Sequence, residues 1–265
     1  MSQVLNTSHL NANVSLDMEQ IKTVCPSVFT DHAAPSTTQR YTHLPTSVVV
    51  QDMMNLGWQV VKAQEIKARK NKGYQKHLVV FRHPDIMIKG QNGDDAYPQL
   101  LLTNSHDGKS AFHFRVGIYR LVCSNGLVVA DAEFSNMVIR HFGYTFEQLK
   151  TNITGVINGL PNLVNKINLF KSTILSQTQL NEFARKAINF RGKSDINIEN
   201  LLTPVRDQDT GSDLWSTFNR VQEKLIGGNF KYGRKNRQAR SIKNFQQDIK
   251  INEQLFELAA SYCAA

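Results

Sequence analysis

Hydrophobic and polar residues change their spacing along the chain, and each change marks a different kind of element. Residues 1–45 are rich in Asn, Ser, Thr, His and Pro, which predicts an N-terminal arm with at most one short helix. From residue 46 the apolar positions follow a helical spacing up to Gly57, which can take the left-handed conformation that ends a helix. The apolar face of this short amphipathic helix consists of Val49, Val50, Met53 and Met54.

The following stretch reads as an antiparallel meander. Runs of β-branched, aliphatic and aromatic residues alternate with short polar connections, the pattern of strands joined by hairpins. The first connection, 69–73, is basic, the second is Asn104–Gly108, and Asn125-Gly126 predicts a third, tight turn. The strand runs are Trp58–Ala68, His77–His83, Leu100–Thr103, Phe112–Tyr119, Leu121–Cys123 and Leu127–Val129.

Alternation within the run Phe112–Tyr119 separates two faces of the predicted sheet. Successive side chains of a strand point to opposite faces, so Phe112, Phe114, Val116 and Ile118 share the core face. His113, Arg115 and Tyr119 share the other face, which is available for binding.

After residue 143 the apolar spacing becomes helical. Capping-box spacings at Thr145/Gln148 and Ser176/Gln179 predict two helix starts, and we expect Pro161 to interrupt or restart the first helix. The apolar faces of these helices consist of Phe146, Leu149, Ile153, Val156, Ile157 and Leu160, then Leu163, Ile167, Phe170 and Ile174, then Leu180, Phe183, Ala184, Ala187 and Ile188.

Two more helices complete the C-terminal part. Asp213–Ile226 carries Leu214, Phe218, Val221 and Leu225 on one side and ends at Gly227-Gly228, and a last helix covers Ile251–Tyr262. The predicted fold class is therefore α+β, an antiparallel meander sheet with a basic hairpin followed by a helical C-terminal half. We expect an arm at 1–45, a helix-plus-sheet core at 46–143 and a helical region at 144–265 that packs on the sheet as one integrated domain.

Composition narrows the class of protein. The 265 residues are 41% hydrophobic and 20% charged, close to an average folded protein. Cys25, Cys123 and Cys263 are too scattered for a disulfide framework or a thiolate zinc site. With no apolar run of about 18 residues and no signal-like N-terminus, we expect a cytoplasmic protein without membrane contact.

Positive charge is concentrated in two windows. Residues 58–90 carry eight basic and two acidic side chains, and residues 231–243 carry six basic and none acidic. Together the two windows carry a net charge of +12, whereas the whole chain carries +9. The residues outside the windows therefore have a net charge of −3. Such local charge favours a polyanionic partner, with nucleic acid first, over general solubilisation.

In the first window, a row of cations along a hairpin would match the phosphates of a nucleic acid strand and release condensed counterions on binding. The alternative is that lysines protect a sheet edge from strand-to-strand association. The predicted phosphate contacts between residues 62 and 82, together with the neighbouring strand, are Lys62, Lys67, Arg69, Lys70, Lys72, Lys76, Arg82, His113 and Arg115.

The second window combines cations with one aromatic residue after a Gly pair. A flexible segment of this kind can follow a phosphate backbone while Tyr232 stacks on a base, as in sequence-tolerant single-strand binders. The alternative is a solvated loop without a ligand. The predicted contacts are Lys231, Tyr232, Arg234, Lys235, Arg237, Arg240 and Lys243.

Other residues are candidates for a catalytic, metal-binding or polar site. His106, Asp107 and His113 could supply metal ligands or an acid–base pair, but their spacing matches no known metal signature, so we favour His106 and Asp107 as turn formers. The polar run 219–224 fits a network between elements, and Trp58 fits the core. No P-loop, GxSxG, HExxH or paired-carboxylate motif is present, so the sequence predicts no cofactor and no metal.

Four stretches resemble the family of phage and plasmid proteins that carry domain of unknown function 932. The resemblance implies a product of a mobile genetic element and no agreed activity. The element order and charge also resemble, more faintly, the Rad52-like single-strand annealing proteins of phages. The four stretches are Pro26–Phe29, Arg40–Thr46, Leu102–Leu127 and Trp215–Gly228.

We therefore expect a mobile-element DNA-binding protein that holds single-stranded DNA and promotes annealing or recombination. Annealing would require a homo-oligomer, because an extended strand must be presented over more nucleotides than one small fold covers. Two alternatives stay open: a metal-dependent enzyme that acts on nucleic acid or nucleotides, and a protein-interaction module directed at host functions.

Overall fold

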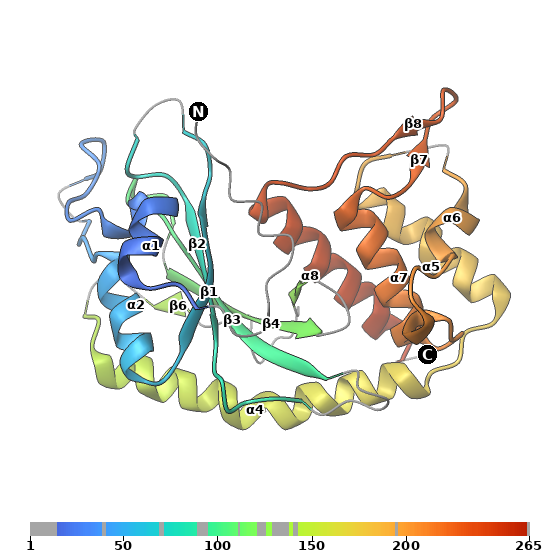
Figure 1. The fold of residues 1–265 in the computed structure, drawn as a ribbon, viewed down its shortest axis with the longest axis horizontal. Coiled ribbons are helices and arrows are strands. Elements are labelled where there is room, and N and C mark those ends of the chain that lie inside the picture. Colours follow the sequence, from blue (N-terminus) through green and yellow to red (C-terminus); the bar gives the residue numbers. More distant parts are fainter. Residues whose placement is uncertain are drawn as a thin grey trace. The chain divides into compact units, whose positions relative to one another are not determined.

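An antiparallel sheet occupies the N-terminal half of the chain and helices occupy most of the C-terminal half, which confirms the α+β class (Figure 1). The computed structural model describes residues 15–38, 41–68, 72–88, 95–110, 112–120, 126–128, 138–139, 143–193 and 196–263. Contacts divide the chain into two units. Unit 1 consists of Met1–Gly126 and Asp131–Asn158 and holds most of the sheet. Unit 2 consists of Leu127–Ala130 and Gly159–Ala265 and holds most of the C-terminal helices.

The sheet of unit 1 is a meander. Its strands follow one another in chain order from β1 to β5, with β6 paired to β4. The pairs β1–β2, β2–β3 and β3–β4 are antiparallel, which confirms the first two predicted hairpins. The third predicted turn, at Asn125-Gly126, falls mostly outside the described residues. The strands are β1 (Gln59–Glu65), β2 (His77–Arg82), β3 (Ala96–Asn104), β4 (Phe112–Arg120), β5 (Gly126–Val128) and β6 (Val138–Ile139).

Strand β4 shows the predicted division into two faces. Its residues Phe112, Phe114, Val116 and Ile118 are buried, whereas His113, Arg115 and Tyr119 are only half-buried. Burial of alternate aromatic and aliphatic side chains fixes the register, since a shift by one residue would expose all four of them. Trp58 lies in the core with 3% of its surface exposed, as predicted.

The segments before the sheet pack into unit 1. Helix α1 (Met18–Val24) starts with a capping box between Asp17 and Gln20 and is followed by the 3-10 helix η1 (Pro26–Phe29). Ile21 and Val28 are fully buried, so these segments contribute to the core. The predicted helix at 46–57 is confirmed as α2 (Thr46–Asn55), which ends before Gly57 with a φ of 87°.

Helix α4 (Phe146–Ser172) runs through Pro161 without a break, so the predicted interruption is wrong. Proline removes one backbone donor, but Leu160 and Leu163 are buried on either side of it and hold both halves in one helix. Ile174 was expected to continue the apolar face. It lies beyond the end of α4, forms a bridge with Asp213 and is 67% exposed.

The other helices of unit 2 begin and end at recognisable signals. The capping box of Ser176 and Gln179 is present at the start of α5 (Gln177–Asn189). Helix α7 (Leu214–Gly227) is capped by Asp213 and ends at Gly228. The last helix, α8 (Phe245–Ser261), starts six residues earlier than predicted, because the Asn244 side chain caps it by accepting from the Gln246 backbone N–H. Short elements between α5 and α7 are α6 (Ile198–Leu202) and the 3-10 helix η3 (Asp207–Asp209).

The core of unit 2 joins α4, α7 and α8. Phe170 of α4 and Phe256 of α8 have ring centroids 5.3 Å apart, and both side chains are buried. Phe218 and Leu225 of α7 are fully buried as well. Among the described residues, no helix has both the length and the apolar character that crossing a membrane would need.

Candidate nucleic-acid interface

The second basic window forms an ordered hairpin, where the sequence had predicted a flexible segment. Strands β7 (Lys231–Tyr232) and β8 (Arg237–Gln238) pair antiparallel. Gly233 and Asn236 in the connecting turn have φ values of 71° and 47°, which Gly and Asn adopt more readily than other residues. The hairpin projects beyond the helices of unit 2 (Figure 1).

Gly228 ties this hairpin to the end of α7. Its φ of 75° is left-handed, and a Cβ at this position would overlap the backbone of Arg240. The Gln238 side-chain amide donates to the Gly228 carbonyl oxygen at 2.6 Å. Close approach of two backbone segments therefore sets where Arg240 lies, and only glycine permits it.

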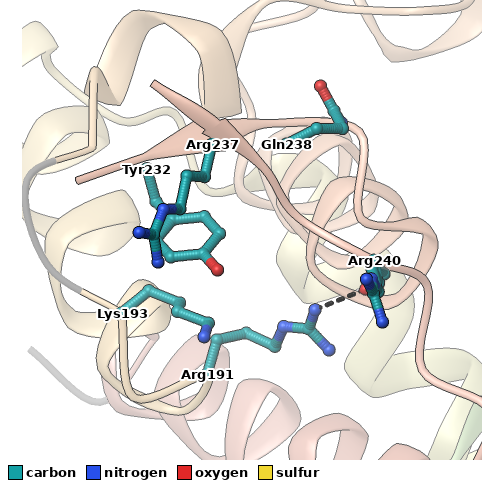
Figure 2. A pocket seen from close by; sticks show the side chains of 6 residues that line it. All are labelled: Arg191, Lys193, Tyr232, Arg237, Gln238 and Arg240. Atoms are coloured by element: carbon teal, nitrogen blue, oxygen red, sulfur yellow. Dashed lines mark hydrogen bonds between the residues drawn. The ribbon is translucent and has the colours of Figure 1, made fainter. Parts of the chain in front are cut away.

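A pocket with a volume of about 440 Å³ opens beside the hairpin (Figure 2). Two of its cations come from the hairpin region that the sequence had singled out, and two come from the turn after α5. Among the residues whose placement is described, no acidic side chain lines it. The lining residues are Arg191, Lys193, Tyr232, Arg237, Gln238 and Arg240.

Neutral groups support the cations of this pocket. The Lys193 Nζ lies 4.4 Å from the centroid of the Tyr232 ring, and the Arg191 guanidinium carbon lies 6.0 Å from that of Phe230. Arg191 Nη2 also donates to the Arg240 carbonyl oxygen at 2.7 Å, the bond drawn in Figure 2. Aromatic faces and a carbonyl attract a cation without cancelling its charge, so the pocket remains positive.

Arg191 has a hydrogen-bond donor that its contacts with Phe230 and Arg240 do not use. Its Nε–H is buried and has no hydrogen-bond partner in the part of the chain that the structure describes. Burial lowers the pKa of its guanidinium, which nevertheless stays charged at neutral pH. An unsatisfied buried donor on a charged group favours an anionic acceptor.

Electrostatics point to an anion as the missing partner. Within the described ranges, no ion pair involves Arg191, Lys193, Arg237 or Arg240. Four like charges around one pocket repel each other, and an anion would relieve that repulsion. Arginine also matches phosphate oxygens with two parallel hydrogen bonds.

The remaining cations of the second window surround this site without lining it. Lys231 belongs to β7, Arg234 and Lys235 to the turn, and Lys243 to the segment before α8. All four are exposed. One ring face of Tyr232, the predicted stacking residue, is covered by Lys193, so stacking on a base would use the other face.

The first basic window lies on the β1–β2 hairpin of unit 1. Lys62, Lys67 and Lys72 are exposed and Lys76 is half-buried, whereas Arg69 and Lys70 fall outside the described residues. Unit 1 contains this window and unit 2 contains the other one. Their convergence on one continuous track stays a prediction.

Two predicted contacts of unit 1 lie side by side on β4, and a third is buried. Arg115 donates to the Thr103 hydroxyl at 3.2 Å. The pKa of His113 is lowered by burial first and then by Arg115 and Lys76, so His113 lies within electrostatic reach of both cations. Arg82 is only 6% exposed, with its guanidinium carbon 5.1 Å from the Tyr97 ring centroid, and it offers little surface to a ligand.

The candidate catalytic residues His106 and Asp107 have contacts typical of a core residue and a turn residue. His106 is fully buried, with its ring centroid 4.7 Å from that of His43 and 5.3 Å from that of His77. Asp107 accepts from the Ser105 hydroxyl and the Lys109 backbone N–H, which are turn contacts, as predicted. Among the residues with a described placement, no three His, Cys, Asp or Glu side chains gather as metal ligands would.

His77 is the centre of the buried polar network around those rings. Its Nδ1 lies 3.1 Å from the Gln75 carbonyl oxygen, which can only accept, so Nδ1 carries the proton. Its Nε2 then accepts from the Thr46 hydroxyl at 2.8 Å. Burial lowers the pKa of His77 to about 4, so the ring is neutral at physiological pH.

The polar run on α7 connects elements of unit 2, as predicted. Arg206 donates two hydrogen bonds to Glu223, at 2.5 and 2.6 Å. Gln222 donates to Asn252 of α8 at 2.9 Å, and Lys224 donates to the carbonyl oxygens of Asn200 and Thr203. These side chains therefore stabilise the packing of the helices.

Arg191 and Lys193 are the functional candidates that sequence reasoning missed. They flank Gly192 directly after the predicted helix at 180–188, and this short basic turn was the only signal available. About 40 residues separate this turn from the hairpin in the chain, so the sequence does not connect the two. Only the tertiary fold brings the two segments together.

Comparison with known proteins assigns the chain to a family. The family described as "Domain of unknown function (DUF932)" matches residues 34–256. The chain belongs to the DUF932 family. The match spans both basic windows and every residue of the pocket, but the description of the family assigns no activity.

Two relatives of the DUF932 chain come from Escherichia coli (strain K12). They are the UPF0380 proteins YfjQ and YafZ, each 30% identical over 254 residues, which cover 92% of this chain and 90% of the relative. Their names state no ligand or reaction. No solved structure matches the chain.

Proposed function

We propose that this DUF932 chain is a mobile-element DNA-binding protein that holds single-stranded DNA through phosphate contacts. The observation that carries the proposal is the pocket of Arg191, Lys193, Arg237 and Arg240, whose described lining includes no carboxylate. Phosphate contacts supply most of the sequence-independent affinity of proteins for nucleic acids. The mobile-element context comes from the family resemblance.

The hairpin around the pocket fits a strand that continues past one bound phosphate. Lys231, Arg234 and Lys235 are exposed on it and can meet neighbouring phosphates. Tyr232 has one ring face not covered by Lys193, and aromatic stacking accepts any base. An unpaired base is free to stack in this way, which favours single strands over duplex DNA.

The β1–β2 hairpin of unit 1 supplies a second group of contacts in this proposal. Lys62, Lys67 and Lys72 are exposed cations, and Arg115 extends the positive face onto β4, where His113 offers a neutral ring beside it. We expect each cation that meets a phosphate to add to the salt dependence of binding.

Annealing and recombination are the cellular roles that we propose for this binding. A strand must be held over many nucleotides with its bases accessible, and one copy of a small fold covers only roughly 4 to 16 nucleotides. We therefore expect several copies on one strand. Light scattering with and without single-stranded DNA measures this number, and a protein that stays monomeric on DNA would exclude annealing.

The DNA-binding proposal is tested by fluorescence anisotropy with labelled single-stranded and duplex oligonucleotides over a range of salt. Four pocket cations on single-stranded DNA would contribute up to about 3 to the slope of log K against log salt, at roughly 0.7 per contact. The double variant Arg237→Ala/Arg240→Ala should lower this slope by about 1.4.

A matched control separates the pocket from total charge. Lys250 is exposed on α8 and does not line the pocket, so Lys250→Ala should leave both slope and affinity close to those of the unchanged protein. Absence of binding at low salt, or binding that ignores salt, would end the DNA proposal. Equal affinity for duplex DNA would remove its single-strand part.

A further inference from the structure

The pocket beside β7–β8 concentrates charge at one place. Phosphodiesters along a strand carry one charge each and are best met by cations in a row, such as Lys231, Arg234 and Lys235 on the hairpin. The pocket instead gathers four cations around a single concave space. Convergent charge of this kind fits a ligand group with more than one negative charge.

A phosphate monoester has the matching chemistry. It carries a charge of about −1.5 to −2 at neutral pH and three terminal oxygens that accept strong hydrogen bonds. On the protein side, the side chains of Arg237 and Lys193 donate no hydrogen bond to any described residue, and the Nε–H of Arg191 has no described acceptor. These side chains therefore carry more N–H donors than the two non-bridging oxygens of a phosphodiester can accept.

The size of the pocket argues for a phosphate attached to a larger group. About 440 Å³ lies within the range of pockets that hold small organic ligands, which starts near 300 Å³. An isolated phosphate would leave most of this volume unfilled. Tyr232 in the lining offers an aromatic surface to a sugar or base next to the phosphate.

We propose that this pocket binds a nucleoside phosphate monoester, the terminal phosphate at the end of a DNA strand. The inference rests on the proposed function, since it assigns the strand end to the pocket and the rest of the strand to the surrounding hairpin. A free nucleotide offers the same chemistry. The test therefore distinguishes the two sources.

The experiment compares oligonucleotides of one sequence that carry an internal fluorophore and differ only at their ends. One has hydroxyl groups at both ends, one has a 5′-phosphate and one has a 3′-phosphate. Anisotropy with the full chain should give an affinity about ten-fold higher for one of the phosphorylated strands, the effect of one added hydrogen bond between charged groups. Calorimetry with thymidine 5′-monophosphate and 3′-monophosphate measures free nucleotides directly.

Variants connect the preference to the pocket. Arg237→Ala and Arg240→Ala each change an exposed side chain, so both variants should fold, which circular dichroism confirms. Each should abolish most of the preference for a terminal phosphate, whereas Lys250→Ala should keep it. A preference that survives both pocket variants would place the strand end elsewhere and overturn the inference.

The remaining outcomes separate this inference from the proposed function. Equal, salt-dependent affinity for all three oligonucleotides would overturn the terminal phosphate while DNA binding stands. Binding of a mononucleotide as tight as that of the phosphorylated strand would support the monoester and identify its source as free nucleotide. Absence of binding by every oligonucleotide and both mononucleotides would overturn both proposals.

Discussion

Acidification should destabilise this protein through His77, a neutral histidine in the interior of unit 1. The ring is fully buried and donates from Nδ1 to the Gln75 carbonyl oxygen. Its Nε2 accepts from the Thr46 hydroxyl. Protonation of Nε2 would place a charge in a fully buried site and remove the acceptor of the Thr46 hydroxyl. The folded state therefore resists the second proton.

The sign and size of the effect follow from the pKa of His77. Burial lowers it from 6.5 to about 4 in the folded state, whereas the unfolded chain keeps the ordinary value. Between these two values the unfolded state binds more protons, so stability is present above pH 6.5 and is lost as the pH falls toward 4. At 1.36 kcal/mol per pKa unit, the loss is about 2 kcal/mol at pH 5 and about 3 kcal/mol at full protonation.

Urea denaturation between pH 7 and pH 5 measures this loss as a fall in the free energy of unfolding. His77→Gln should lower stability at pH 7, because it disturbs the buried hydrogen bonds, but should reduce the pH dependence by about 2 kcal/mol. His43 and His113 also have pKa values lowered by burial, so part of the pH dependence should remain in the variant.

The matched control is His32→Gln, because the His32 side chain is 68% exposed. This variant leaves the buried hydrogen bonds of His77 in place, so the part of the pH dependence that His77 causes should remain. The reasoning is refuted if the free energy of unfolding is the same at pH 7 and pH 5. It is refuted as well if His77→Gln and His32→Gln show the same pH dependence.

Three further predictions concern unit 2. Gly228→Ala should lower the free energy of unfolding by more than about 1 kcal/mol and weaken DNA binding, since it adds a left-handed alanine and a clash with the Arg240 backbone. Unchanged denaturation and anisotropy would contradict this. Glu223→Gln should lower the free energy of unfolding by about 2 kcal/mol, because it breaks the paired hydrogen bonds from Arg206, and should leave DNA affinity unchanged. A loss of affinity in the folded variant would assign this pair to the interface. Lys193→Ala should lower the salt slope of binding by roughly 0.7 in the anisotropy assay, and an unchanged slope would exclude a phosphate contact for Lys193.

Local signals in the sequence predicted much of the fold. The capping box of Ser176 and Gln179 and the glycine stop at Gly228 depend on residues within one turn of the helix end, so the sequence shows them directly. Alternation in β4 likewise reports burial of Phe112 and its neighbours. Pro161 misled the prediction because burial of residues on both sides outweighs one missing hydrogen bond.

The candidate site could be predicted only in part. Arg237 and Arg240 belong to a window whose charge is visible in the sequence, but strands of two residues are too short to show a period. The contribution of Arg191 depends on tertiary contacts across about 50 residues, which no local pattern encodes. Charge alone also could not show that Arg82 is buried against Tyr97.

A crystal structure of the full chain with a short single-stranded oligonucleotide tests the central claim most directly. The account predicts a DNA phosphate in the pocket, within hydrogen-bonding distance of Arg191, Arg237 and Arg240, with the strand continuing along the β7–β8 hairpin. DNA bound to another surface while the pocket holds no phosphate would contradict it.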